Sequence, residues 1–199
     1  MARPKIKKEA ILKSANQIFG SKGYHEASMI EIAELAEVGK GTLYEYFPSK
    51  SVLFLEVMRY TAEKYIEQMA DAIAQSDNFN GKLDDFIKTY REIIGENYQK
   101  TGIFLTSQNA MNMAAENSVE VMQIICSMRD QGMKLILLIL ECGKNEGKIQ
   151  SENLEFVADI FIDMVHRSCI RIFYHEMTSE QIETESNLLL KLLLNGIAR

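Results

Sequence analysis

The sequence predicts an all-α protein, and three observations lead to that prediction. Apolar side chains recur every three to four residues along most of the 199-residue chain, as they do on one face of a helix. Only two prolines are present, so few positions interrupt a helix. No stretch alternates apolar and polar residues as a half-buried strand would. The composition, 47% hydrophobic and 25% charged, is that of an ordinary globular chain.

The N-terminal part predicts short helices separated by clear breaks. The first predicted helix covers Lys5–Phe19, and Gly20 and Gly23 are candidates for the residue that ends it. A second helix is predicted to begin at Ser28, because Ser28 and Glu31 have the spacing of a capping box. It continues through the apolar positions that follow, until a glycine-containing segment interrupts it.

Longer helices follow. A very short helix fits Lys40–Phe47 and is ended by Pro48, which disfavours helical backbone at the residue before it. The next predicted helix is long and covers Lys50–Gln75. The remaining periodic segments are Leu83–Asn97, Gly102–Ala114, Ser118–Cys142, Leu154–Glu176 and Ser179–Ile197, which gives about nine helices in all.

Charge and length suggest two domains, a small one over residues 1–49 and a larger helical one over residues 50–199. The formal net charge is −6, but residues 1–50 carry +2 and the remainder −8. A basic end on an acidic chain suggests contact with a polyanion at that end. The imbalance is small, so a chance distribution of surface charge stays open.

The cysteines and the apolar runs predict a cytoplasmic protein. Cys126, Cys142 and Cys169 are odd in number, far apart and set in apolar helical sequence, which indicates reduced packing residues. The N-terminus lacks the apolar core of a signal peptide. The longest strongly apolar run, Leu135–Leu140, is far shorter than the ~20 residues of a membrane span, so no membrane partner is expected.

The two short helices that begin at Ser28 and at Lys40 have the outline of a helix-turn-helix. The second would be the reading helix, at ~12 Å about as long as a DNA major groove is wide. Gly41 lets backbone amides approach a phosphate, and Thr42 can contact a phosphate or a base edge. Two tyrosines, Tyr44 and Tyr46, combine an apolar ring with a hydroxyl suited to the sugar–phosphate backbone.

Two further features complete the motif. Leu43 and Phe47, four residues apart, are expected to face inward and hold the reading helix to its domain. Lys50 is expected behind Ser49, the predicted N-cap of the long helix, where a cation opposes the helix dipole. A phosphate in front of both residues would offset that conflict, so we expect Lys50 to contact phosphate rather than only solvent.

At these residues the chain resembles the tetracycline-repressor (TetR) family of bacterial transcriptional regulators. The resemblance covers about the first quarter of the chain; its matching residues are Ile11, Leu12, Ala15, Phe19, Gly23, Tyr24, Ser28, Ile32, Ala33, Ala36, Val38, "GTLYEYF" at 41–47, Ser49, Lys50 and Leu53. The resemblance implies operator-DNA contacts at Ser28, Lys40, Gly41, Thr42, Tyr44, Tyr46 and Lys50. Gly39 departs from the serine or other capping residue frequent there, and Glu45 places a negative charge in the reading helix, facing solvent or accepting from a cytosine.

The last two helices are apolar around much of their circumference. Leucines and an isoleucine between residues 188 and 197 cover roughly 240° of the last helix at 100° per residue. A chain end that apolar is expected to pack both on its own chain and on a second copy, giving a four-helix homodimer interface. The expected interface residues are Phe161, Val165, Ile172, Leu189, Leu193 and Ile197. A fully enclosed helix in a monomer is the alternative.

The middle of the chain is rich in methionine and aromatic residues, which suit a pocket for an apolar small molecule as well as they suit a plain core. The candidate pocket residues are Phe86, Tyr90, Phe104, Met122 and Met164. The resemblance implies that a small-molecule effector shifts the Lys50–Gln75 helix and respaces two reading helices on a palindromic operator. It thus implies a ligand-responsive regulator, by family habit a repressor.

Two alternatives are weaker. An enzyme or metal site could use His166 and Cys169, three residues apart, with His175 beyond them, but no clustered set of metal ligands and no catalytic motif accompanies them. We therefore expect no enzymatic activity and no cofactor. A helical homodimeric interaction or ligand-binding protein without DNA binding is the second alternative, and the retained motif residues argue against it.

Overall fold

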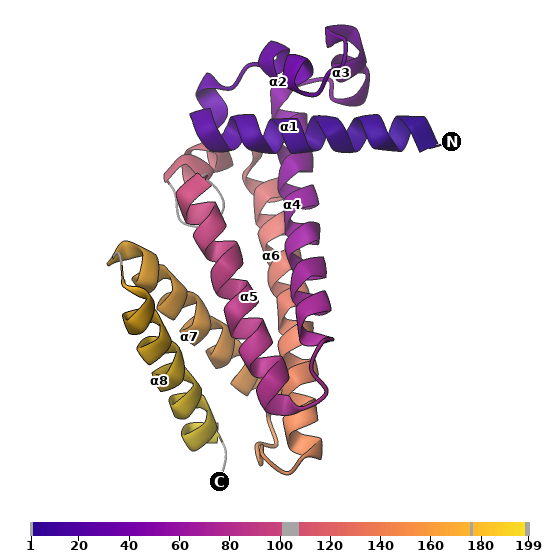
Figure 1. Cartoon of the computed structure of the whole chain (residues 1–199). Coiled ribbons are helices and arrows are strands. Elements are labelled where there is room, and N and C mark those ends of the chain that lie inside the picture. Colours follow the sequence, from indigo (N-terminus) through magenta and orange to yellow (C-terminus); the bar gives the residue numbers. More distant parts are fainter. Residues whose placement is uncertain (1, 101–107, 176, 198–199) are drawn as a thin grey trace. The chain divides into compact units, whose positions relative to one another are not determined.

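The computed structural model describes residues 2–100, 108–175 and 177–197, and within them the side chains of 6–95 and 119–192 except 173, 174, 176, 179 and 190. These residues form helices joined by turns and short loops, with no strand in the described ranges. The helices are α1 (Ala2–Glu26), α2 (Met29–Leu35), α3 (Lys40–Tyr46), α4 (Lys50–Ile73), α5 (Phe79–Lys100), α6 (Gln108–Asn145), α7 (Leu154–Tyr174) and α8 (Ser179–Ile197) (Figure 1). The prediction of an all-α fold is confirmed.

Two helix assignments differ from the sequence prediction. The predicted helices Gly102–Ala114 and Ser118–Cys142 are one helix over the described residues, because α6 runs unbroken from Gln108 to Asn145. No proline interrupts this segment, and its glycines are tolerated inside a helix. The described ranges therefore hold eight helices rather than the nine expected.

The structure also shows which of the two candidate glycines interrupts the first helix. Gly23 has a positive φ of 78°, and the helical backbone of α1 is broken there, whereas Gly20 lies inside the helix. A left-handed backbone suits glycine because no Cβ clashes with the chain. Of the two predicted candidates, Gly23 is thus the one that ends the regular part of the helix.

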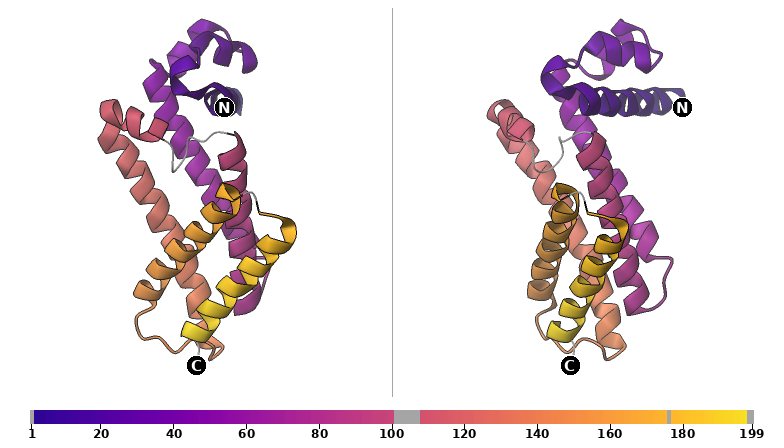
Figure 2. Two further views of the ribbon diagram at one scale, coloured as in Figure 1. Left: turned by 90° about the vertical axis from the view of Figure 1, so that its left-hand side faces the viewer. Right: turned by 60° about the vertical axis from the view of Figure 1, so that its left-hand side comes forward.

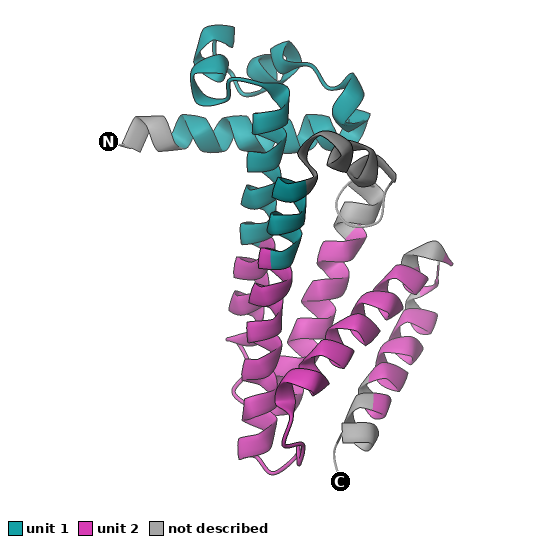
Figure 3. Ribbon diagram, turned by 180° about the vertical axis from the view of Figure 1, so that it is seen from behind, with its two compact units in different colours: residues 1–64, 96–126 teal, residues 65–95, 127–199 magenta. Residues whose placement is uncertain are grey.

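The chain divides into two compact units (Figure 3), while the division at residue 49 stays a prediction from the sequence. Unit 1 comprises residues 1–64 and 96–126, and unit 2 comprises residues 65–95 and 127–199. The first half of α4 belongs with α1–α3, because its side chains complete their core. Phe54 of α4 packs edge-on against Phe19 of α1, with ring centroids 5.1 Å apart.

Polar contacts also tie α4 to α1 within unit 1. Lys8 Nζ donates to Glu56 Oε2 at 2.9 Å, and the Tyr60 hydroxyl donates to Glu9 at 3.3 Å. The apolar core beneath them is built at helical spacing from Ile11, Leu12, Ala15, Phe19, Ile32, Ala33, Leu43, Phe47, Leu53, Phe54, Val57 and Met58, all buried. A unit of 49 residues alone would lack the α4 half of this core.

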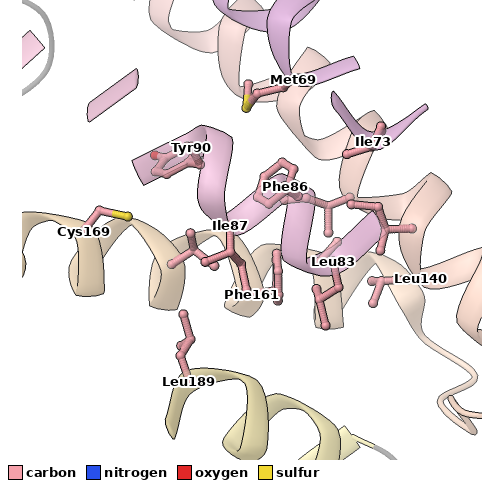
Figure 4. Packing of buried hydrophobic residues seen from close by; sticks show 14 of the residues in the cluster. Met69, Ile73, Leu83, Phe86, Ile87, Tyr90, Leu140, Phe161, Cys169 and Leu189 are labelled. Atoms are coloured by element: carbon pink, nitrogen blue, oxygen red, sulfur yellow. The ribbon is translucent and has the colours of Figure 1, made fainter. Parts of the chain in front are cut away.

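Unit 2 is built around one apolar cluster to which α4, α5, α6, α7 and α8 contribute (Figure 4). At its centre, Phe86 of α5 contacts Phe161 of α7, with ring centroids 5.8 Å apart. Leu189 of α8 reaches the cluster from the last helix, which lies beside α7 (Figures 1 and 2). The C-terminal half of the described chain thus has a core of its own.

The ends of the unit 2 helices are capped by side chains. Glu146 accepts a hydrogen bond from the Phe79 amide at 2.7 Å, which satisfies a free donor at the start of α5. Thr178 and Gln181 exchange hydrogen bonds at the start of α8, at 2.8 and 3.4 Å. Gly147 follows the last turn of α6 and has a φ of 72°. This left-handed backbone is common for the glycine that ends a helix.

No helix among the described residues is both long and apolar enough to span a bilayer. The three cysteines carry free thiols: Cys169 is buried, Cys142 is half-buried and Cys126 is exposed. Cys126 is therefore a surface residue of this chain and not the packing residue that was predicted, whereas Cys169 lies in the core of unit 2.

Candidate nucleic-acid interface

Helix α2 begins where the sequence predicts, at Ser28. Its extended backbone, φ −107° and ψ 134°, marks the N-cap, and its hydroxyl oxygen accepts from the Ile30 amide at 3.2 Å. Glu31, the other half of the predicted capping box, instead accepts from Lys22 Nζ at 2.7 Å. That hydrogen bond is the main cause that lowers the pKa of Glu31, and the Ser28 amide makes a smaller contribution in the same direction. Of the two side-chain hydrogen bonds of the predicted capping box, only the one that the Ser28 hydroxyl accepts meets hydrogen-bond geometry.

The turn between α2 and α3 depends on a residue that the sequence reasoning missed. Glu37 has φ 54°, in the left-handed region that non-glycine residues avoid. The chain then turns so that the Val38 amide donates to the Ala33 carbonyl at 2.9 Å. A glycine or asparagine at the position after a helix would have signalled this conformation. Glutamate carries no such signal.

Helix α3 is held by two buried side chains. Leu43 and Phe47 are 0% and 1% exposed, which confirms the prediction that they anchor this helix. Gly39 is the N-cap, with φ −64° and no side-chain hydrogen bond to the helix. The three amides of the first turn therefore have no side-chain cap from Gly39, so they remain available to a ligand oxygen.

The opposite face of α3 carries the predicted DNA-binding residues. Lys40, Gly41 and Tyr44 are exposed, while Thr42 and Tyr46 are half-buried on the other flank. The Lys40 ammonium lies 6.0 Å from the centroid of the Tyr44 ring, one turn along the helix. A Cβ added at Gly41 would meet nothing within 4 Å. The helix thus presents a cation, an open backbone position and one phenol on one flank, and a hydroxyl and a second phenol on the other.

Glu45 lies at the middle of this exposed face. At 100° per residue it is about 180° from the midpoint of Leu43 and Phe47, and it is exposed. The side chain therefore points away from the domain, as both alternatives left open by the sequence require, namely facing solvent or accepting from a cytosine. If the exposed face of α3 entered a DNA major groove, the Glu45 carboxylate would lie near the base edges.

Lys50 is placed differently from the other predicted contacts. Its ammonium donates to the carbonyl oxygens of His25 and Ala27, both at 3.0 Å, and lies 4.7 Å from the centroid of the Tyr24 ring. Ser49 is the N-cap of α4 as predicted, since its hydroxyl accepts from the Val52 amide at 3.1 Å. An ammonium has three donors, so one remains for a phosphate.

Three of the other lysines of unit 1 are engaged with carboxylates. Lys8 pairs with Glu56, Lys13 with Glu9 at 3.0 Å and Lys22 with Glu31. The Lys13 bond lowers the pKa of Glu9, and the Lys8 bond is the main cause that lowers the pKa of Glu56. The basic character of this end of the chain is therefore partly compensated on its own surface.

The candidate pocket residues are dispersed. Phe86 and Tyr90 are buried in the unit 2 core, and Met164 packs against that core. Met122 is 58% exposed on α6, and Phe104 lies outside the described residues. The Tyr90 hydroxyl is 2.8 Å from His166 Nδ1, a polar pair at the edge of an apolar core. The structure brings Phe86, Tyr90 and Met164 into one cluster and leaves Met122 out of it.

The candidate interface residues are mostly enclosed by their own chain. Phe161, Val165, Ile172 and Leu189 are between 0% and 7% exposed, and the side chains of Leu193 and Ile197 lie outside those described. Among the described side chains of α7 and α8, the large apolar residues left exposed are others, namely Phe156, Ile160, Leu188 and Leu192. A wide apolar arc indicates more apolar surface than one buried face needs; it does not show which part of that surface the chain itself covers.

The Cys–His alternative has little geometric support. His166 is bonded to Tyr90, and burial raises the pKa of the Cys169 thiol to about 12, so the thiol is protonated at neutral pH. Within the described ranges, no three or more His, Cys, Asp or Glu side chains gather as metal ligands would.

Comparison with known proteins agrees with the geometry. Residues 11–57 match the family described as bacterial regulatory proteins, tetR family. The HTH-type transcriptional regulator YuxN of Bacillus subtilis is 34% identical over 74 residues, 37% of this chain and 25% of YuxN. YhgD of the same organism, also an HTH-type transcriptional regulator, is 29% identical over 159 residues, 79% of this chain and 80% of YhgD.

A solved structure extends the likeness to the whole fold. The regulator FadR from Bacillus subtilis superposes with a TM-score of 0.69 at 20% identity, covering 95% of this chain and 98% of FadR. The part of the chain that matches YuxN spans a quarter of that protein. From that motif, its geometry and these relatives, residues 11–57 form a helix-turn-helix segment of the tetR family of bacterial regulatory proteins.

Proposed function

We propose that this protein is a transcriptional regulator that binds a palindromic operator as a homodimer and responds to a small molecule. The observation that carries the proposal is the outward face of α3, where Lys40, Gly41, Thr42, Tyr44 and Tyr46 surround a buried anchor of two apolar residues. A solvated structural helix has no need of an open glycine, a cation and two phenols together. A helix that meets a sugar–phosphate backbone uses all three.

The chemistry of the contact follows from this face. The α3 amides that Gly39 leaves uncapped point along the helix axis toward an approaching phosphate. Lys40 adds a mobile cation beside them, and the phenols of Tyr44 and Tyr46 supply neutral donors. Ser28 uses its oxygen to cap α2, so its hydroxyl proton is free to be donated to a phosphate. These contacts position the helix, and Thr42 and Glu45 are placed to read bases.

A homodimer is supported by the apolar residues that α7 and α8 leave exposed. Phe156 and Ile160 are 63% and 45% exposed on α7, and Leu188 and Leu192 are 54% and 61% exposed on α8. Each pair is spaced by four residues and so forms a stripe on its helix. The predicted residues Phe161, Val165, Ile172 and Leu189 would support such an interface from beneath.

An apolar effector is supported by the unit 2 core and by one neighbour. The core cluster contains Phe86 and Tyr90 among aliphatic side chains, and Met164 packs against it; methionine in particular adapts to apolar ligands. FadR from Bacillus subtilis was solved in complex with stearoyl-CoA. We propose an effector with an apolar chain for this protein as well, its binding favouring one spacing of the two α3 helices.

DNA binding is tested on the chain's own promoter region at several salt concentrations. We expect the logarithm of the affinity to fall linearly with the logarithm of salt, with a slope near −0.9 for each phosphate neutralised. Tyr44→Ala should weaken binding, while Leu138→Ala, an exposed apolar truncation on α6, should leave it unchanged. Absent or salt-independent binding would favour the alternative of an interaction protein without DNA-binding activity.

Gly41→Ala gives a sharper test of close approach. The methyl group has open space in the free protein and replaces glycine inside a helix, so the variant should be more stable by up to about 1 kcal/mol. If α3 presses against a phosphate at Gly41, the same methyl must weaken DNA binding. A variant that gains stability and keeps full affinity would remove Gly41 from the interface.

The dimer and the effector are tested separately. Leu188→Glu and Leu192→Glu should yield monomers by analytical ultracentrifugation, whereas Leu138→Glu on α6 should remain dimeric. If all three variants remain dimeric, the exposed apolar residues of α8 are not the dimer interface. Native mass spectrometry of freshly purified protein, followed by operator release with acyl-CoA thioesters of several chain lengths, tests the effector class. Release that is independent of chain length would argue against an apolar recognition site.

A further inference from the structure

Lys50 lies at the first residue of α4, but its ammonium is turned toward the end of α1. It donates to the carbonyls of His25 and Ala27 at 3.0 Å each and lies over the Tyr24 ring at 4.7 Å. The side chain is half-buried in this position. Three separate contacts on one short segment make a specific site for this ammonium, which a solvated lysine would not need.

Of the two carbonyls that receive Lys50, that of His25 lies in the last turn of α1 and that of Ala27 lies in the link between α1 and α2. The last turn of α1 has no further amides to bond its oxygens, and the negative end of the helix dipole lies there. A lysine ammonium satisfies both needs at once. This contact also removes the conflict of a cation at the start of α4, because the charge is displaced from α4's own amides toward the oxygens of α1.

The segment held by Lys50 leads directly into the helix-turn-helix. Gly23 breaks α1, and Ala27 is followed at once by Ser28, the residue that caps α2. The Tyr24 ring is packed edge-on against Phe54 of α4, with centroids 5.3 Å apart, so the same segment is held on its apolar side too. Lys50 therefore fixes the point at which α2 starts relative to the first turn of α4.

We propose that Lys50 is a positioning residue for the DNA-reading surface, acting through the Tyr24–Ser28 segment, and that this contact outweighs any contact of its own with phosphate. This inference rests on the proposed DNA-binding function. Because α3 follows α2 after a tight turn, an error in the start of α2 displaces Lys40, Gly41 and Tyr44 together. Loss of Lys50 should thus weaken binding through geometry, without removing a released counterion.

Operator binding by Lys50→Met and Lys40→Met separates the two roles. Both variants keep a side chain of similar length and lose the charge. Lys40→Met should reduce the magnitude of the salt slope by about 0.9 per protomer, as a lost phosphate contact does. Lys50→Met should lower affinity by about tenfold or more at every salt concentration, with the wild-type slope retained. A slope reduced as in Lys40→Met would overturn the proposal.

Nuclear magnetic resonance of the DNA-free protein tests the contact itself. The Lys50 ammonium should give a slowly exchanging ¹H–¹⁵N signal, assigned by its loss in Lys50→Arg, while a solvated ammonium exchanges too fast to be seen. In Lys50→Met, the amides of Ala27 and Ile30 should shift and exchange faster. An unprotected Lys50 signal in the wild-type protein would overturn the inference even if the variant failed to fold.

The arms of the experiment also separate this inference from the proposed function. If the wild-type protein shows no salt-dependent DNA binding, the regulator proposal fails, and with it the functional role of Lys50, whatever the ammonium signal shows. If wild-type DNA binding is salt-dependent and Lys134→Met, which removes an exposed charge on α6 in unit 2, binds as the wild type does, the Lys50 result stands on its own. Loss of binding in Lys50→Met with unshifted Ala27 and Ile30 amides would count against positioning.

Discussion

The Tyr90 hydroxyl lies 2.8 Å from Nδ1 of His166, and this hydrogen bond joins α5 to α7 at the edge of the unit 2 core. Burial raises the pKa of Tyr90, so the phenol keeps its proton at all ordinary pH values and can donate to a neutral imidazole. Burial is also the main cause that lowers the pKa of His166; Asp163 opposes the shift and Arg167 adds to it.

This pair should make the stability of unit 2 depend on pH. Because the folded pKa of His166 is depressed, the unfolded chain takes up a proton first as the pH falls below about 6.5, and stability is lost in that window. We expect the urea midpoint to fall between pH 7.5 and pH 5.5. His166→Gln should show a smaller fall over the same interval, and an equal fall in both proteins would assign the effect to other groups.

Tyr90→Phe isolates the hydrogen bond from the ring. The variant keeps the packing of the aromatic ring against Phe86 but leaves His166 Nδ1 without its partner. We expect the free energy of unfolding to drop by ~1 kcal/mol at pH 7.5. Chemical denaturation with a fluorescence readout is sufficient, and a variant as stable as the wild type would mean that the bond contributes nothing net.

Two glycines of α6 should respond in opposite ways to the same substitution. A Cβ at Gly143 would lie 2.8 Å from Phe79 Cδ2 and 2.9 Å from Ile149 Cδ1, closer than real contacts allow. At Gly132 the nearest atom is Ile162 Cδ1 at 3.5 Å, an ordinary contact. We expect Gly143→Ala to destabilise by about 1–3 kcal/mol and Gly132→Ala to stabilise by up to about 1 kcal/mol. Thermal unfolding of both variants decides the sign.

The turn before α3 stores conformational strain at Glu37. Its φ of 54° costs a non-glycine residue ~1 kcal/mol or more, and a glycine at this position would avoid that cost. Part of this gain is lost again, because glycine has more conformational freedom in the unfolded chain. Glu37→Gly should therefore stabilise unit 1 by a few tenths to about 1 kcal/mol. Glu37→Ala keeps the Cβ and should show no such gain. If alanine stabilises as much as glycine, charge rather than backbone strain is the cause.

Glu45 should set both the strength and the selectivity of DNA binding. Its carboxylate lies at the middle of the exposed α3 face, where it repels phosphates on any DNA and can accept from a cytosine amino group. Glu45→Gln should tighten binding to non-operator DNA and relax discrimination at one G·C pair of each half-site by about 1–3 kcal/mol. Competition binding with single-substituted operators measures both; uniform tightening on every sequence would show that Glu45 reads no base.

Local sequence rules were enough to predict the boundaries and the buried anchor of the helices in the helix-turn-helix. Leu43 and Phe47 anchor α3, Ser28 caps α2 and Gly23 breaks α1, because each depends on spacing or backbone freedom within a few residues. The destination of a long side chain was not predictable in this way. Lys50 crosses to carbonyls more than twenty residues earlier in the chain, and sequence spacing says nothing about such a contact.

The larger helical part shows the same limit. The apolar arc of α7 and α8 indicated two covered faces, but only the packing shows that Phe161 and Leu189 face inward and that Phe156 and Leu192 do not. Continuity of α6 was also hidden, since small and polar residues near its start resemble a loop. Tertiary contacts decide these points, and they override local propensity.

The paired lysines of unit 1 bear on how such a protein would search a genome. Lys8, Lys13 and Lys22 already hold carboxylates of their own chain, so a polyanion must compete for them. Weak attraction to arbitrary DNA leaves fewer copies trapped on the millions of competing sites, and the ratio of specific to non-specific affinity governs occupancy. A DNA-binding regulator of the proposed kind, with a net charge of −6, would thereby favour its operator over arbitrary DNA.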